Sequence, residues 1–353
     1  MNKKLVASSV ALCLAAMAGC ASAATVDVYA RMDMGLNYFK DAKGGENVSM
    51  ASSQNSTSRF GLKGKHKLDN GMEAGFKFEA NVDGDTGAGV KKGRFFYREA
   101  ILYVKGDFGE FGMGRCGLID SGNGTYGLIE DDFVAFGTGW GETVGTNDMI
   151  MMGLNKRTDN VLTYKSPEFA GTTFYVQGST QMDSIDEDYE DEADGSDDAT
   201  KYLGVGAKYD GGAFKAFMTA SLEDLGKADM GNGGSHATTI SAGVMYDFGA
   251  VNLKFATQYF DKGALGEEEG MGYVLSATAP LAGGKLYGYL GYADAEEIGD
   301  SSVKIENQMA SLGYEYKLSK QVHVYVAGSY VCEEKDNDKD ETFEAMTGLV
   351  VKF

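Results

Sequence analysis

The chain has 353 residues, of which 52 are acidic and 32 are lysine or arginine, so its formal charge is -20. This balance excludes a conventional nucleic-acid-binding protein, because phosphates require a basic surface. Hydrophobic residues make up 43% of the chain, which excludes a disordered acidic polymer. The 50 glycines, 20 tyrosines and only two prolines favour strands and tight turns over helices.

The first residues have the pattern of a secretory signal peptide. Two lysines precede an apolar stretch over residues 5–18, and Ala21-Ser22-Ala23 follows as a small-residue cleavage site. We therefore predict that residues 1–23 are removed and that residues 24–353 form a single domain. Met17-Ala18-Gly19-Cys20 leaves a lipoprotein signal open as an alternative, although the leucine usual at its first position is missing.

The residues that carry most enzyme chemistry are scattered. His66, His236 and His323 are isolated and lack metal-ligand spacing, and there is no Gly-x-Ser-x-Gly sequence. After cleavage of the signal, Cys116 and Cys332 remain, too far apart in sequence for a disulfide scaffold, although an oxidising compartment leaves their pairing open. The sequence predicts no catalytic residue, no metal site and no enzyme.

Beyond the signal, hydrophobicity alternates with a period of two. Residues 26–38 place an apolar residue or tyrosine at every even position, and residues 72–82 repeat the pattern with polar residues between. This alternation predicts strands with one apolar and one polar face. The apolar face points inward in a soluble sandwich and toward lipid in a membrane barrel.

The lengths of the connections distinguish these two folds. Seven short turns alternate with eight long polar segments, so that fifteen connections join sixteen strands. The short turns lie at residues 68–71, 106–109, 166–171, 210–212, 247–249, 280–284 and 317–320. The long segments are 40–57, 83–93, 116–155, 181–200, 222–237, 261–271, 294–306 and 332–342. The pattern predicts an all-β, 16-stranded antiparallel transmembrane β-barrel, with short periplasmic turns, long external loops and a lumen wide enough for water.

The C-terminus supports the same fold. Phe343, Ala345, Leu349, Val351 and Phe353 share one face, and the chain ends on the aromatic residue. This arrangement is typical of an ordinary last strand. We favour a second interpretation, in which Phe353 at the barrel seam is an assembly signal.

Several motifs, in this order and spacing, resemble the Gram-negative general porin family. They are Ser58-Arg59-Phe60-Gly61-Leu62-Lys63-Gly64, Asn70-Gly71-Met72-Glu73-Ala74, Arg98-Glu99-Ala100-Ile101-Leu102-Tyr103-Val104, Tyr164-Lys165-Ser166-Pro167-Glu168-Phe169-Ala170-Gly171 and the terminal Phe353. The resemblance covers the whole mature chain. It implies an outer-membrane homotrimer in which each subunit has its own aqueous pore, narrowed by a third long loop that folds into the barrel.

The resemblance also implies a basic wall at the constriction, opposite acids on the third loop. The wall residues are Arg31, Arg59, Arg98 and Arg157. Alternation independently places Arg31 and Arg59 on polar faces, and Lys63 and Lys77 on the same faces as further pore-lining residues. The acids expected on the third loop are Asp120, Glu130, Asp131, Asp132 and Glu142. A solvated external loop with ordinary charges is the alternative, but loops of this length are usually functional or disordered.

Arg98 conflicts with simple alternation. If Arg98 points into the lumen, its neighbour Glu99 points outward. A charge on the lipid face costs up to about 2–4 kcal/mol near the midplane, less for an acid, unless a subunit contact or the headgroups relieve it.

The acidic loops set our expectations for ions and partners. Residues 183–198 contain ten acids and residues 333–341 contain six. Acids at the mouth of a pore concentrate cations, so we predict a modest cation preference. Neither segment has a complete calcium-binding loop, and loose Ca²⁺ or Mg²⁺ bridging to lipopolysaccharide phosphates is the expected interaction. The predicted function is passive diffusion of small polar solutes and ions, and the alternatives are a substrate-specific channel or a barrel that acts as an adhesin or anchor.

Overall fold

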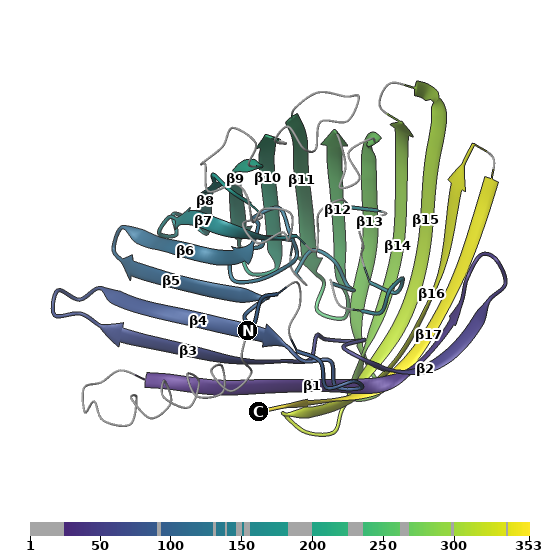
Figure 1. The fold of residues 1–353 in the computed structure, drawn as a ribbon, viewed down its shortest axis with the longest axis horizontal. Coiled ribbons are helices and arrows are strands. Elements are labelled where there is room, and N and C mark those ends of the chain that lie inside the picture. The colour runs from purple at the N-terminus through teal and green to yellow at the C-terminus, as the bar shows by residue number, and fades with distance from the viewer. Residues whose placement is uncertain are drawn as a thin grey trace.

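The computed structural model describes residues 25–89, 93–129, 132–137, 140–145, 150–151, 156–182, 200–224, 236–261, 268–297, 300–336 and 338–353. Within this part of the chain, 17 strands form one antiparallel sheet that closes by pairing of β1 with β17 (Figure 1). No helix of the described residues is long and apolar enough to cross a membrane. The strands are β1 (Thr25–Lys40), β2 (Glu46–Ser52), β3 (Arg59–Lys67), β4 (Glu73–Asn81), β5 (Glu99–Gly106), β6 (Gly109–Gly117), β7 (Arg157–Lys165), β8 (Thr172–Ser179), β9 (Lys201–Asp210), β10 (Phe214–Asp224), β11 (His236–Asp247), β12 (Asn252–Asp261), β13 (Glu268–Leu281), β14 (Gly284–Glu297), β15 (Asp300–Lys317), β16 (Val322–Lys335) and β17 (Asp338–Lys352).

The 17 strands occupy sixteen positions in the wall, because β2 and β3 are two parts of one interrupted strand. Residues 34–40 of β1 pair with β2, and residues 25–31 of β1 pair with β3. Both partners lie on the edge of β1 opposite β17. Residues 53–58, which we call the insert, leave the wall between β2 and β3. The prediction of a closed 16-stranded barrel is confirmed.

The seven predicted short turns all join neighbouring strands, but three predicted long segments are wrong as loops. Residues 40–57 contain β2, which pairs with β1. In residues 294–306 and 332–342 the strands continue, so that Glu297 pairs with Asp300 and Lys335 with Asp338. The strands of these two hairpins, β14–β17, are longer than β3–β8 and reach the upper right of the view (Figure 1). Above the membrane both faces of a hairpin meet water, so polar residues there do not indicate a loop.

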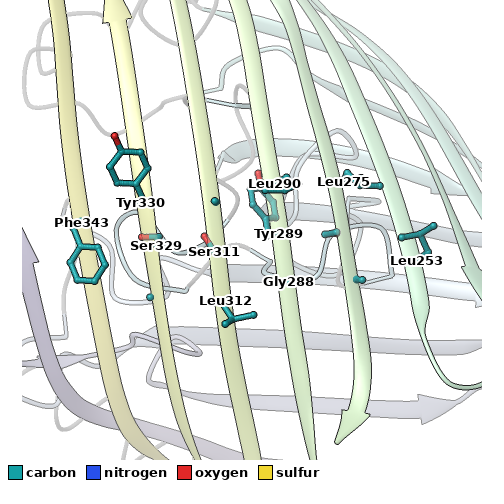
Figure 2. Close-up of a pocket in the computed structure, with 14 residues that line it drawn as sticks. Leu253, Leu275, Gly288, Tyr289, Leu290, Ser311, Leu312, Ser329, Tyr330 and Phe343 are labelled. Atoms are coloured by element: carbon teal, nitrogen blue, oxygen red, sulfur yellow. The ribbon is translucent and has the colours of Figure 1, made fainter.

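The outer face of the barrel is apolar. Leu290 on β14 and Leu312 on β15 point outward and are 58% and 63% exposed. Between such leucines, Gly288 and Gly328 help to form the floor of a shallow apolar depression of about 570 Å³ across β12–β17 (Figure 2). An exposed apolar surface of this extent suits a hydrocarbon solvent, as predicted from the alternation.

Depth in the membrane decides the cost of a charge on this face. Replacing Leu290, in the middle of β14, with arginine is expected to lower the free energy of unfolding in lipid vesicles by about 2–4 kcal/mol. Asp294→Arg is the matched control, because Asp294 is exposed on the same face of the same strand but lies near its external end. We expect a cost of about 0–1 kcal/mol there. Equal costs in a denaturant titration would show that β14 does not cross the bilayer as described.

The core lies inside the barrel and is built largely by the connection between β6 and β7, which we call loop 3. Its described residues are 118–129, 132–137, 140–145, 150–151 and 156. Phe136 and Trp140 of loop 3 are buried, and the ring centroid of each lies 5.3 Å from that of Tyr287 on β14. Phe133 packs in the same way on Phe217 of β10, at 4.5 Å. The expectation that the third loop folds inward is confirmed.

Candidate functional site

The first half of loop 3 is attached to the barrel wall by a charged contact. The Asp132 carboxylate lies 3.3 Å from the Nζ atom of Lys208 on β9 and 3.1 Å from that of Lys215 on β10. Burial acts to raise the pKa of Asp132, but hydrogen bonds and charges from Lys215 and Lys208 prevail and hold it below its usual value. The carboxylate is therefore ionised at neutral pH, and the attachment persists there.

A second acid holds the base of loop 3. Both carboxylate oxygens of Asp120 accept hydrogen bonds from the wall, one from the Tyr202 hydroxyl at 3.1 Å and the other from the Ser221 hydroxyl. Asp120 is buried, and burial raises the pKa of its carboxyl. Its placement makes it a structural contact with β9 and β10 rather than a group that faces the pore.

The tip of loop 3 is held by Glu344, a fully buried acid on the inner face of β17. The Glu344 carboxylate accepts hydrogen bonds from the backbone N–H groups of Glu142, at 3.1 and 3.2 Å, and Thr143, at 2.7 Å. It also accepts bonds from the Thr143 hydroxyl at 2.9 Å and from Asn37 Nδ2 at 2.8 Å. A carboxylate with this many donors fixes the loop strongly, because hydrogen bonds to charged groups are stronger than neutral ones.

Loop 3 and the insert meet across the lumen and enclose a polar cavity of about 360 Å³. The Gly141 N–H of loop 3 donates to the Gln54 carbonyl of the insert at 2.7 Å. Three arginines from the wall, Arg31, Arg59 and Arg98, face the cavity. The other lining residues are Asn55, Ser56 and Thr57 of the insert and Gly122, Asn123, Gly124, Ile129, Asp132, Gly137 and Trp140 of loop 3.

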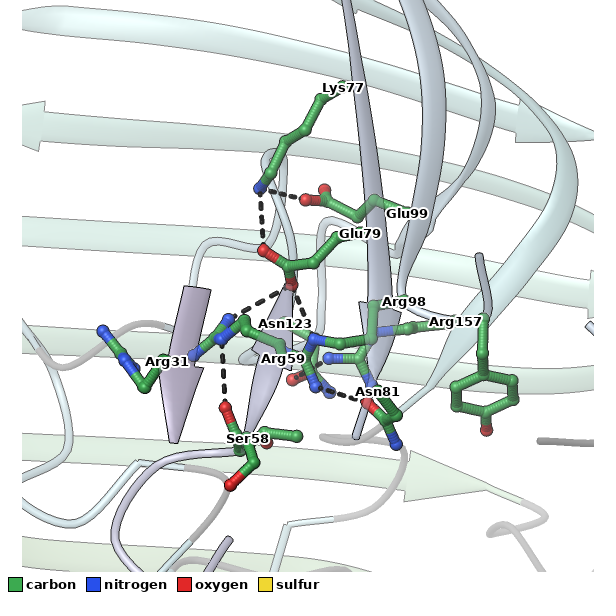
Figure 3. A network of polar contacts seen from close by, with 12 residues as sticks. Arg31, Ser58, Arg59, Lys77, Glu79, Asn81, Arg98, Glu99, Asn123 and Arg157 are labelled. Atoms are coloured by element: carbon green, nitrogen blue, oxygen red, sulfur yellow. Dashed lines mark hydrogen bonds and ion pairs between the residues drawn. The ribbon is translucent and has the colours of Figure 1, made fainter. Parts of the chain in front are cut away.

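Two of these arginines, Arg59 and Arg98, are held in place by the buried carboxylate of Glu79 on β4 (Figure 3). Glu79 accepts hydrogen bonds from Arg98 Nε at 2.5 Å, Arg59 NH1 at 3.2 Å and the Tyr29 hydroxyl at 2.8 Å. The oxygen that accepts from Tyr29 also lies 3.8 Å from Lys77 Nζ. One carboxylate thus fixes several cations at one height in the lumen and leaves the cluster with a net positive charge.

The conflict expected between Arg98 and Glu99 does not occur. Arg98 precedes β5, and residues 93–98 are not part of a strand, so alternation does not apply across this pair. Glu99 also points inward, where it forms an ion pair with Lys77 and accepts a hydrogen bond from the Thr125 N–H at 2.6 Å. The expectation of an outward-facing Glu99 is wrong because Arg98 lies outside β5, so its orientation does not determine that of Glu99.

The remaining predicted basic residues lie around this cluster. Arg157, the first residue of β7, donates to Asn123 Oδ1 of loop 3 at 2.8 Å. Lys63 lies on the inner face of β3, toward the short-turn end, where it is exposed and lies 4.0 Å from Asp27. Arg31, Arg59, Lys63 and Lys77 thus lie on the faces that alternation indicated, and their role in lining the pore stays a prediction.

The structure distributes the predicted loop acids among different roles. Asp132 lines the cavity, whereas Glu142 contributes its backbone N–H to the contact with Glu344. Glu130 and Asp131 lie outside the described residues. The terminal Phe353 is 77% exposed and its backbone pairs with Ala30 at the seam of β1 and β17, so its role as an assembly signal stays a prediction.

Sequence reasoning missed three buried acids that organise the site, Glu79, Glu344 and Asp33. Alternation places all three on the lumen side of their strands, but that signal is shared by many other residues and does not show which of them contact the arginines, loop 3 or the insert. The insert itself has a weak signal, the run Ser52-Ser53-Gln54-Asn55-Ser56-Thr57-Ser58, which interrupts the alternation.

Comparisons with known proteins agree with this architecture. A family model described as Gram-negative porin matches residues 8–338. The chain belongs to the Gram-negative porin family. Outer membrane porin protein 32 of Delftia acidovorans is 29% identical over 337 residues, which cover 92% of this chain and 88% of the relative. An outer membrane porin protein of Bordetella pertussis is 28% identical over 379 residues, which cover 94% of each chain.

Solved structures show the same fold for this porin. An anion-selective porin from Comamonas acidovorans has a TM-score of 0.69 at 22% identity, covering 94% of this chain and all of that one. The outer membrane protein OmpT of Vibrio cholerae, in a trimer form, has a TM-score of 0.64 at 15% identity, covering 94% of this chain and all of that one. The protein is therefore an outer-membrane β-barrel of a Gram-negative bacterium and a channel protein rather than an enzyme.

Proposed function

We propose that this porin forms a water-filled channel for passive diffusion of small hydrophilic solutes and ions, and that anions pass its constriction more readily than cations. The observation that carries the proposal is the convergence of Arg31, Arg59 and Arg98 on one polar cavity between loop 3 and the insert. Fixed charges that line a narrow path determine which ions enter it. The name of the anion-selective porin from Comamonas acidovorans supports the same sign.

The cation preference predicted from the acidic loops has weaker support. Residues 183–198 lie outside the described part of the chain. Most of the acids of residues 333–341 lie at or near the exposed end of the β16–β17 hairpin. Exposed charges act over about one Debye length, roughly 8 Å at physiological salt, whereas the arginines line the narrow path itself.

A reversal-potential measurement decides between the two signs. We expect purified protein in a planar bilayer, under a tenfold KCl gradient, to show a reversal potential of the sign for chloride preference. A potential of the opposite sign would restore the cation preference. No conductance at all would favour an adhesin or anchor, which would refute the channel proposal.

A substrate-specific channel is the second candidate, because the cavity adds hydroxyl and amide groups to its arginines. Groups placed in this way can bind one solute and thereby slow its passage. The discriminating measurement is the current as a function of solute concentration. A linear rise supports general diffusion, and saturation by one organic anion supports a specific channel.

We also propose that the porin works as a homotrimer in a bilayer containing lipopolysaccharide. A trimer form of OmpT of Vibrio cholerae, which has the same fold, supports this assembly. Conductance steps that recur in threes and a native mass of three subunits are the expected results. Loose binding of Ca²⁺ or Mg²⁺ at the external acids stays a prediction.

A further inference from the structure

We propose that the insert is a second constriction element, separate in sequence from loop 3, and that Asp33 is the residue that positions it. This inference deepens the proposed channel function and rests on it. The insert joins β2 to β3, so it enters the lumen from the wall itself, far in sequence from loop 3. Three of its six residues, Asn55, Ser56 and Thr57, line the arginine cavity.

The register of the strands shows that the barrel wall does not need all the residues of the insert for its strand pairing. Arg31 pairs with Arg59, and Met34 pairs with Ser52. Between these pairs β1 has two residues, whereas the opposite chain has the six residues 53–58. The opposite chain therefore has four residues that the pairing does not need. Because four is even, the faces of β2 and β3 stay in phase on either side of the insert.

Asp33 holds the extra residues in the lumen. Its side chain is fully buried, and one carboxylate oxygen accepts hydrogen bonds from the N–H groups of Asn55 at 2.6 Å and Ser56 at 2.8 Å. The other oxygen accepts a bond from the Tyr325 hydroxyl at 2.8 Å. The Asp33 N–H donates to the Ser58 hydroxyl at 2.9 Å. Asp33 thus fixes both the middle and the end of the insert.

The insert in turn sets the positions of the arginines. Arg31 donates a hydrogen bond to the Ser56 hydroxyl, and Arg59 Nε donates to the Thr57 carbonyl at 3.1 Å. The insert therefore has two effects on passing solutes. It narrows the lumen, and it provides acceptors that turn two guanidinium groups toward the cavity.

The surplus of four residues allows a direct test. Deletion of residues 54–57 joins Ser53 to Ser58, which places Ser53 opposite Asp33 and Ser58 opposite Met32 in one continuous register. We expect the deletion variant to fold as a barrel, to conduct roughly two-fold more current than the wild type because its narrow path is wider, and to admit larger neutral sugars in a liposome-swelling assay. The sign of the ion preference is expected to stay the same, because Arg31, Arg59 and Arg98 remain.

Two further variants distinguish the effect of the insert's cavity-lining side chains from that of its backbone, and test the role of Asp33. Replacing Asn55, Ser56 and Thr57 together with alanine keeps the insert and its contact with loop 3, and should raise the sugar size limit by less than the deletion does. Asp33→Asn removes the charge that binds the insert, and should widen the sugar size limit without a change in strand content by circular dichroism.

The outcomes separate this inference from the channel function. Wild-type protein without conductance would overturn both. A conducting wild type, together with folded deletion and alanine variants whose conductance and sugar limits match it, would overturn the second constriction element alone. If Asp33→Asn leaves the sugar limit unchanged while the deletion raises it, Asp33 is not the positioning residue. If the deletion variant does not fold, the alanine variant still decides the matter.

Discussion

Replacing both Arg31 and Arg59 with glutamine is expected to lower the chloride-to-potassium permeability ratio by more than an order of magnitude. A unit charge 4 Å from a passing ion contributes about 1 kcal/mol even in bulk water. Removing two such charges from the rim of one cavity therefore changes the partition of a monovalent anion by about 2 kcal/mol. The two arginines pair across β1 and β3, so they act at the same height in the lumen.

This double substitution is suitable because the buried carboxylates beside the two arginines keep other partners. Asp33 keeps its hydrogen bonds from the Asn55 and Ser56 N–H groups and from the Tyr325 hydroxyl. Glu79, which bonds to Arg59, keeps its hydrogen bond from Arg98 and its contact with Lys77. Lys63→Gln is the matched control, because Lys63 lies on the same face of β3 and its loss changes the charge in the same direction. Reversal potentials in a KCl gradient should change strongly for the double variant and little for Lys63→Gln. A change for Lys63→Gln about half that of the double variant, in proportion to the charge removed, would mean that the overall charge of the lumen, and not the arginine cavity, determines selectivity.

The fold was largely predictable from sequence because a barrel in a membrane has two simple periodicities. Alternation gave the faces of strands such as β1 and β4, and the alternation of short and long connections gave sixteen wall positions. The errors lie where water replaces lipid. In residues 294–306 and 332–342 the strands extend beyond the membrane, where outward residues such as Asp294 are polar. In residues 40–57 a short strand was hidden between a turn and the insert.

The site was predictable only to the extent that alternation applies. It indicated the lumen side for Arg31 and Arg59, but it failed for Arg98 and Glu99, because β5 begins only at Glu99 and alternation does not extend back to Arg98. The contact of Glu344 with Thr143 joins residues 201 positions apart and depends on the path of loop 3 inside the barrel. No local pattern in a sequence reports such a path. The same holds for Asp33, whose partners lie in the insert and on β16.

Glu344→Ala is expected to release the tip of loop 3 and to convert a steady channel into one with large current fluctuations and a higher mean conductance. Three hydrogen bonds from loop 3 end on the Glu344 carboxylate, from the Glu142 N–H, the Thr143 N–H and the Thr143 hydroxyl. Hydrogen bonds to charged groups contribute about 1.5–3 kcal/mol each, and a buried donor without a partner costs about 1–3 kcal/mol. The free-energy difference between the attached and detached conformations of the tip therefore changes by several kcal/mol in favour of the detached one.

The loop is not expected to leave the lumen completely, because its first half keeps other attachments. Asp132 stays bound to Lys208 and Lys215, and the aromatic packing of Phe136 does not involve β17. Fluctuation should therefore be confined to the tip, residues 140–145. Hydrogen exchange should speed up at the amide of Thr143 and stay slow in the strands, because exchange reports local opening.

Asp340→Ala is the matched control for this experiment. Asp340 lies on the same face of β17, four residues nearer the hairpin end, and is exposed. Its replacement with alanine therefore removes the same charge without changing a contact of loop 3. Glu344→Gln keeps one acceptor oxygen and the shape of the side chain, and should give fluctuations between those of the wild type and Glu344→Ala. If Glu344→Ala conducts as steadily as Asp340→Ala, the tip is held by Gly141 and the packing of Trp140 alone. If both variants fluctuate, the loss of a carboxylate charge from β17 controls the current, because that is the property the two substitutions share.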